Sequence, residues 1–415
     1  MQENKQFFYH RLPNNIKIVH CRTQSAVAYV GVMIGAGTRD ERPEENGMAH
    51  YIEHCVFKGT VFHSARQIIS QIEGVGGEIN AYTTKEETTF YAATLNEHVP
   101  QTLRLISEMV LCPTFPKAET DKERMVIYDE IESYNDSPSE LIYDDFENML
   151  FAGHSLAQPI LGTKKTLRNI SKSPDRPRAW MAQHYRPERM VVFCQGDIPA
   201  SRFVRLAEQA FGNYVNPLPP DRQLSFAQEE DRQPQSASYQ KHTHQTHVML
   251  GARAYPIAHA KHLPLYLLNN ILGGGSLNSR LNIALRESRG LVYTIESTYT
   301  PLSDTGYWST YFACEPEQLE QCMSVIRKEL QRLIQTPLTP RELRAALRQL
   351  RGQMAISAQN AENNALSMAK SMLYRDYAPT WQQTFERIEQ ITPEQLQEVA
   401  REVLNPENLV VLKYD

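Results

Sequence analysis

The 415-residue sequence has no long hydrophobic run and no basic, apolar leader segment. No apolar stretch approaches the roughly 18 residues that a membrane-spanning helix needs. The N-terminal residues also lack the basic start and continuous apolar core of a secretory signal. These absences predict a protein that does not span a membrane and that stays in the cytoplasm.

Paired cysteines and an excess of basic charge are absent as well. The six cysteines are scattered without a C-x-x-C pair, and the net charge is −5 at pH 7. A chain of this size does not need disulfide bonds to stabilise its core, so the thiols are expected to be reduced. A mildly acidic chain argues against a nucleic-acid partner, which normally requires a basic face.

What the sequence does contain is a repeat of itself. Pro187 and Pro406 each precede a glutamate and a β-rich apolar run, and they lie 219 residues apart. The segments that begin at Thr88 and Trp308 share an alternating strand, a short acidic turn and an amphipathic helix, at a similar offset. Because this period is far longer than that of a solenoid, it predicts two copies of one domain.

The boundary between the copies is predicted where the composition changes. A stretch rich in Pro, Gln, Ser and Asp reads as a linker over 216–240, which leaves a first domain over 1–215 and a second over 241–415. Strand patterns such as "AVAYVGVMIGAG" alternate with helical ones such as "VPQTLRLISEMV". Hairpin patterns recur too, and this mixture predicts α+β sandwiches with largely antiparallel sheets.

Two histidines and a glutamate lie within five positions in "HYIEH", as His50, Glu53 and His54. If this stretch is helical, His50 and His54 stand at i and i+4 and project from one face, so their imidazoles can converge on one cation. The motif alone leaves a second reading open, in which surface histidines simply pair with a carboxylate. A zinc ion that does chemistry also needs a third protein ligand and an open position.

A candidate for the third ligand lies further along the chain. The segment "DKERMVIYDEIESYNDSP" reads as a helix on which Glu123 and Glu130 lie two turns apart on one face. Glu130 follows His54 by 76 residues. Carboxylates on a helix are usually solvated charge, and their spacing alone does not decide between a ligand and a surface acid.

With these residues in view, the chain resembles the pitrilysin/insulinase family of zinc metallopeptidases, and within it the subunits similar to mitochondrial processing peptidase. The likeness covers nearly the whole chain, including "GAGTRDERPEENGMAHYIEHCVFKGT" and "ALRESRGLVYTIESTYT". H-x-x-E-H is the signature of inverted zincins. The resemblance implies an α+β fold of two homologous α/β sandwiches, the processing-peptidase or LuxS-like metallohydrolase fold, that forms half of a clamshell.

The resemblance also implies roles for individual residues. They are the Zn²⁺ ligands His50, His54 and Glu130, the general base Glu53, the acid Glu123 near the zinc, Asn80 and Ala81 on a substrate-holding edge strand, and the substrate-contacting pair Arg286 and Tyr293. The strand from Ile79 has an ordinary internal strand as its alternative. Cys55, which replaces a commonly apolar residue, is expected to be a buried thiol because it points away from His54 around the helix.

These residues predict a zinc-dependent endopeptidase for peptides or unfolded polypeptide segments bound in extended form. The second repeat has no H-x-x-E-H, so it is expected to keep the fold without the metal. Because the chain has both the zinc set and the Arg286–Tyr293 pair, a homodimer is expected, with a heterodimer containing an inactive sister subunit as the alternative. A catalytically idle scaffold and a zinc hydrolase of non-peptide substrates remain competing readings.

Overall fold

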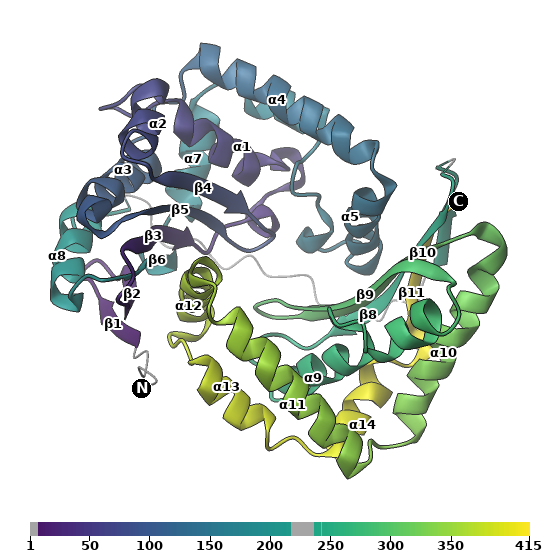
Figure 1. The fold of residues 1–415 in the computed structure, drawn as a ribbon. Helices are drawn as coiled ribbons and strands as arrows, with labels where there is room; N and C mark the ends of the chain where they lie inside the picture. The colour runs from purple at the N-terminus through teal and green to yellow at the C-terminus, as the bar shows by residue number, and fades with distance from the viewer. Residues whose placement is uncertain (1–6, 217–235, 242) are drawn as a thin grey trace. The chain divides into compact units, whose positions relative to one another are not determined.

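The computed structural model describes residues 7–216, 236–241 and 243–415. They form two compact units (Figure 1). The first unit holds the described residues of Met1–Glu132, Gln158–Phe226 and Ser357–Thr380, and the second those of Ser133–Ala157, Ala227–Ile356 and Trp381–Asp415. The segment Ser133–Ala157 thus belongs to the second unit although it lies within the first repeat, and Ser357–Thr380 belongs to the first unit although it lies within the second repeat.

The first unit is built on a six-stranded sheet in the order β1-β2-β6-β3-β5-β4. Its strands are β1 (Phe7–Arg11), β2 (Lys17–Arg22), β3 (Val27–Ile34), β4 (Glu78–Thr83), β5 (Thr88–Leu95) and β6 (Met190–Gly196). Its helices are α1 (Met48–Cys55), α2 (Ala65–Glu73), α3 (Val99–Leu111), most of α4 (Lys117–Asn135), α6 (Lys164–Ile170), α7 (Asp175–His184), α8 (Ala200–Phe211) and α12 (Ala361–Arg375).

Both faces of this sheet are covered by helices. Along β3, Val32 belongs to the core shared with α1, α3, α7 and α8, whereas the next residue, Met33, packs with Met368 and Met372 of α12 on the opposite face. Successive side chains of a strand point to opposite faces, so a strand buried on both sides must be apolar throughout. This explains why the sequence of β3 is almost continuously hydrophobic.

The second unit contains a five-stranded sheet in the order β7-β11-β8-β10-β9. Its strands are β7 (Ser236–Tyr239), β8 (Thr246–Ala254), β9 (Val292–Pro301), β10 (Gly306–Cys314) and β11 (Val410–Tyr414). Its helices are α5 (Pro138–Leu150), α9 (His262–Gly273), α10 (Leu319–Gln335), α11 (Pro340–Ser357), α13 (Trp381–Ile388) and α14 (Pro393–Val403). The predicted linker 216–240 falls mostly outside the described residues, and its last part forms β7.

The two sheets have the same topology, as the predicted duplication requires. When β2, β6, β3, β5 and β4 are matched in that order with β7, β11, β8, β10 and β9, the pairing pattern is identical. In each sheet one pair of strands is parallel, β2 with β6 and β7 with β11, and the other pairs are antiparallel. The α+β class with two related domains and largely antiparallel sheets is confirmed.

Helices α5 and α12 each cover a sheet that is distant in sequence. α5 follows the H-x-x-E-H motif in the sequence and precedes the predicted linker, yet its Phe146 packs with Met249 of β8 in the second unit. α12 comes after most of the second repeat, yet it packs on β2, β3 and β6 of the first unit. Each compact unit therefore includes one helix from the sequence range of the other repeat.

The packing of α12 predicts a measurable contribution to stability. Lys370 Nζ lies 2.6 Å from Glu87 Oε1, and the Tyr374 hydroxyl donates to the other oxygen of this buried carboxylate. The Lys370→Ala variant should lose about 1–3 kcal/mol of unfolding free energy, since Glu87 would keep its burial and lose its charged partner. Lys122→Ala, which removes an exposed ion pair, should change stability by less than about 1 kcal/mol. Equal midpoints for both variants in chemical denaturation would contradict this role for α12.

Within the part of the chain that the structure describes, none of the helices combines the length and the hydropathy that a membrane span requires.

Candidate metal centre

The two histidines of the motif lie on consecutive turns of α1, as predicted. Their ring centroids are 4.6 Å apart, and His50 is buried. The opposite side of the helix enters the hydrophobic core through Ile52 and Cys55, which are fully buried. The core therefore fixes the rotation of α1 and turns both imidazoles to the same side. Cys55 is a buried thiol outside the metal-ligand group, and burial raises its pKa.

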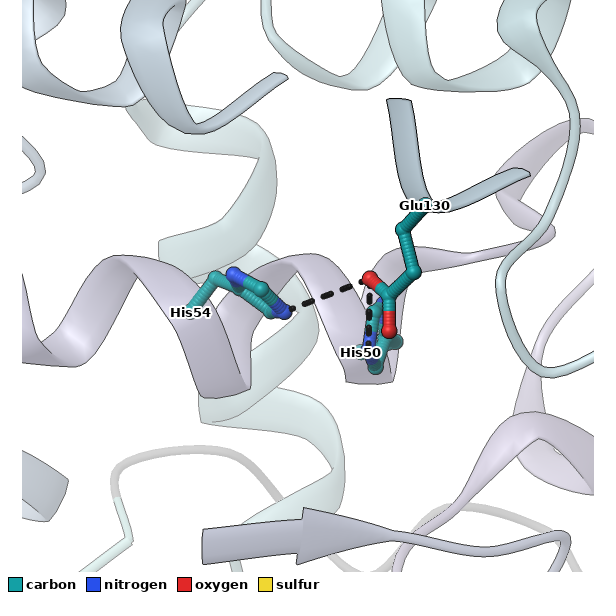
Figure 2. A group of neighbouring side chains, drawn as sticks. All are labelled: His50, His54 and Glu130. Atoms are coloured by element: carbon teal, nitrogen blue, oxygen red, sulfur yellow. Dashed lines mark ion pairs between the residues drawn. The ribbon is translucent and has the colours of Figure 1, made fainter. Parts of the chain in front are cut away.

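Helix α4 brings Glu130 to these imidazoles. Glu130 Oε2 lies 3.8 Å from His50 Nε2 and 3.7 Å from His54 Nε2, as the dashed lines of Figure 2 mark. One ligand atom from each of the three residues lies within 4.8 Å of the other two. Ile127, between Glu123 and Glu130 on the same face of α4, is buried in the core and fixes this face toward α1.

The residues present fit a zinc ion. Glu130 Oε2, which faces both imidazoles, is a buried atom without a hydrogen-bond partner among the described residues, and such an atom is costly unless a cation or another partner binds it. Burial, with a further effect of His54, lowers the pKa of His50 to about 3, so its imidazole is neutral and able to act as a ligand. Two imidazoles and one carboxylate form a three-residue set typical of catalytic zinc.

A chain of polar contacts orients His54. Its Nδ1 lies 3.2 Å from Glu123 Oε2, and Glu123 Oε1 lies 2.7 Å from Lys58 Nζ. A carboxylate on the distal nitrogen of a ligating histidine fixes its tautomer and leaves Nε2 free for the metal. The resemblance implied an acid near the metal at Glu123, and the structure places it against His54, while its role at a bound zinc stays a prediction. Sequence reasoning missed Lys58, although its position four residues after His54 is a helical spacing that could have identified it.

Glu53 is held beside the cluster by the end of β4. Thr83 Oγ1 donates to Glu53 Oε2 over 2.6 Å. Burial raises the pKa of Glu53, whereas the Thr83 hydrogen bond and the proximity of His54 lower it. A carboxylate with a raised pKa that is held beside the cluster can act as a base and take a proton from a neighbouring reactant. Thr83 was not singled out in the sequence, because nothing local marks a threonine at the end of a strand as a partner of a distant glutamate.

A pocket of about 220 Å³ opens next to these residues. Its lining includes Glu53 and His54 from α1, Glu123 from α4, and Asn80 and Ala81 from β4. β4 is the last strand of its sheet, so the predicted edge position is correct. The structure thus brings the predicted base, a predicted ligand and the edge strand together on one pocket.

The predicted pair of the second repeat lies in the second unit. Arg286 belongs to a π-helical segment, Asn282–Glu287, and Tyr293 lies at the start of β9. The Arg286 guanidinium carbon lies 5.7 Å from the centre of the Tyr293 ring, which is 80% exposed. A cation over an aromatic face forms a preorganised pair. Its contact with a substrate at the metal cluster stays a prediction.

Two family models match the sequence. The model of insulinase (peptidase family M16) matches residues 17–164, which include the H-x-x-E-H motif and Glu130. The model described as peptidase M16 inactive domain matches residues 173–350, which include Arg286 and Tyr293. The division agrees with one half that contains the H-x-x-E-H motif and a related half without it.

Individual proteins resemble the chain over almost its full length. "Uncharacterized zinc protease YmxG" of Bacillus subtilis is 32% identical over 401 residues, which cover 96% of each chain. An uncharacterized zinc protease of Streptomyces coelicolor is also 32% identical, over 95% of this chain and 86% of its own. The crystal structure of a protease from Helicobacter pylori has a TM-score of 0.91 at 19% identity, over 99% of both chains, so it has the same fold.

Proposed function

Because the chain belongs to the insulinase family, peptidase family M16, we propose that it is a zinc-dependent endopeptidase of peptides or unfolded polypeptide segments. The observation that carries the proposal is the position of Glu130 Oε2, 3.8 Å and 3.7 Å from two imidazole nitrogens. This oxygen is buried and accepts no hydrogen bond from the part of the chain that the structure describes. His50, His54 and Glu130 would hold the ion.

The chain's own groups would do the rest of the chemistry. When bound, zinc would lower the pKa of water and polarise the scissile carbonyl. Glu53 accepts the proton of the attacking water and delivers it to the leaving amine. Thr83 keeps the Glu53 carboxylate turned toward the pocket. Glu123 and Lys58 hold the imidazole of His54 in one orientation and one tautomer.

The experiment that tests the proposal uses an unstructured peptide with a fluorophore and a quencher at its ends. Purified protein should cleave it, a chelator should stop cleavage, and added Zn²⁺ should restore it. Cleavage that survives complete removal of the metal would contradict a metallopeptidase. Zinc binding without cleavage of any unstructured peptide would instead favour an idle scaffold or a hydrolase of another substrate class.

The position of β4 at the end of its sheet supports recognition of an extended peptide backbone. An edge strand presents unpaired N–H and C=O groups, and a peptide can add to it as a further strand. We therefore predict that N-methylation of a peptide amide near the cut lowers kcat/KM by about tenfold for each hydrogen bond lost, at roughly 1.4 kcal/mol each. Methylation several residues away is the control, and equal kcat/KM for all methylated peptides would contradict strand addition.

The Arg286–Tyr293 pair supports a dimeric enzyme, because the resemblance implies that this pair acts on substrate at the zinc of a clamshell. We propose a homodimer in the cytoplasm, in which Arg286 binds a backbone carbonyl of the peptide and Tyr293 donates to the developing oxyanion. A heterodimer with an inactive sister chain is the alternative.

Complementation tests this arrangement. Glu53→Gln and Arg286→Ala chains, each of low activity alone, should recover about a quarter of wild-type activity when mixed and allowed to exchange, because half of the dimers would contain one intact site of two. No recovery in a mixture that has exchanged subunits would contradict sites assembled in trans. A chain that stays monomeric would contradict the homodimer itself.

A further inference from the structure

The helix that carries both histidines has no cap of its own. α1 begins after Gly47, which has no side chain to accept a hydrogen bond and whose φ of +90° favours glycine. The first N–H groups of a helix have no partner within the helix and need an acceptor from elsewhere. In α1 these groups lie directly before His50, so whatever binds them also sets the position of the first imidazole.

Glu41 supplies the acceptors from outside the helix. Its Oε2 accepts from the Gly47 N–H over 2.8 Å, and its Oε1 accepts from the Ala49 N–H over 2.7 Å. The Asn46 side-chain amide donates to Oε2 as well, over 3.3 Å. Glu41 is 4% exposed, and its burial outweighs the opposing effect of these donors and raises the pKa of its carboxyl to about 8. The two oxygens of Glu41 thus bind N–H groups of Gly47 and Ala49, at the start of α1.

The same end of the helix is fixed from the side by the segment before α6. Gly47 and Gly162 both have positive φ, +90° and +71°, and a Cβ on Gly162 would lie 2.7 Å from the Gly47 Cα. The Asn46 amide also donates to the Pro159 carbonyl over 2.9 Å, and the Gln158 amide donates to the Glu41 carbonyl over 3.1 Å. These contacts fix the start of α1 against the segment before α6.

We propose that Glu41 is a positioning residue of the metal centre, which sets the start of α1 so that His50 and His54 face Glu130 together. The inference rests on the zinc site of the proposed function and not on peptide cleavage. Loss of a group that hydrogen-bonds a metal ligand directly typically weakens metal binding by about tenfold to a hundredfold. Glu41 binds the backbone beside His50 instead, so its loss should have an effect at the lower end of this range.

The test is the zinc affinity of Glu41→Gln and Glu41→Ala, measured by competition with a fluorescent chelator well below each variant's unfolding temperature. Glu41→Ala should bind zinc about tenfold more weakly than wild type. Glu41→Gln, which keeps one acceptor oxygen, should lie between the two. Excess zinc should restore most of the activity of Glu41→Gln, since the ligands and the base are intact.

A matched variant separates positioning from stability. Phe203→Leu truncates a fully buried side chain of α8, a helix of the same unit, and should lower the unfolding temperature while leaving zinc affinity unchanged. Wild-type affinity in both Glu41 variants would overturn the proposal, and so would an equal loss of affinity in Phe203→Leu. If wild-type protein itself bound no zinc, the proposed function would fail. This result differs from the two outcomes above, in which wild-type protein binds zinc.

Discussion

The Glu53→Gln variant should keep its zinc and lose peptide cleavage. Glutamine has nearly the shape of glutamate and still accepts the hydrogen bond from Thr83, so the packing around α1 is preserved. It cannot take a proton from water, however, and the loss of a general base typically costs about 10²–10⁴-fold in rate. The measurement is kcat/KM on the quenched peptide, together with zinc content by atomic absorption.

A second variant, Thr83→Val, serves as the control for this assignment. It removes the hydrogen bond that lowers the pKa of Glu53, so the carboxylate should become protonated at a higher pH. The acid limb of the pH–rate profile should therefore move to higher pH, with activity retained above it. If Glu53→Gln cleaved peptide at the wild-type rate, the proton would have another acceptor, and Glu53 would not be the base.

The second large effect is expected for Glu130→Gln. A neutral amide oxygen replaces the carboxylate oxygen between the two imidazoles, so the ion loses its only negatively charged ligand in the three-residue set. Zinc affinity should fall by more than the roughly 10–100-fold that the loss of an outer partner causes. Cleavage should fall with it at limiting zinc, as competition with a chelator and a parallel peptide assay would show.

Asp129→Asn is the matched control for this variant. Asp129 is the neighbouring residue on α4, carries the same charge and is exposed, and it lies outside the metal-ligand group. Its replacement removes one negative charge from the same turn and should leave zinc binding unchanged within about twofold, because exposed charges are screened by solvent. Equal zinc affinities for the two variants would remove Glu130 from the ligand set.

The sequence predicted the local parts of the site well because its key spacings are helical. His50 and His54 are one turn apart, and Glu123 and Glu130 are two turns apart, so each pair had to share a face once its segment was helical. That α1 and α4 would meet did not follow from periodicity. It came from the resemblance to a known family, and the structure places the four residues together.

The partners of these residues could not be read from the sequence. Thr83 and Glu41 act through contacts 30 and 8 positions away, on Glu53 and on the backbone of Ala49. Hydrophobic periodicity shows that a segment is a helix and which face is apolar, but not which sheet that face will cover. For that reason the grouping of α5 with the second unit and of α12 with the first was not predicted.

The most direct test of the account is a crystal structure of protein grown with zinc, with anomalous diffraction recorded at the zinc absorption edge. The account predicts one strong peak about 2.0–2.1 Å from a nitrogen of His50 and of His54 and about 2.0–2.2 Å from an oxygen of Glu130. A fully zinc-loaded crystal whose peak lay elsewhere, or whose Glu130 carboxylate turned away from the ion, would contradict it.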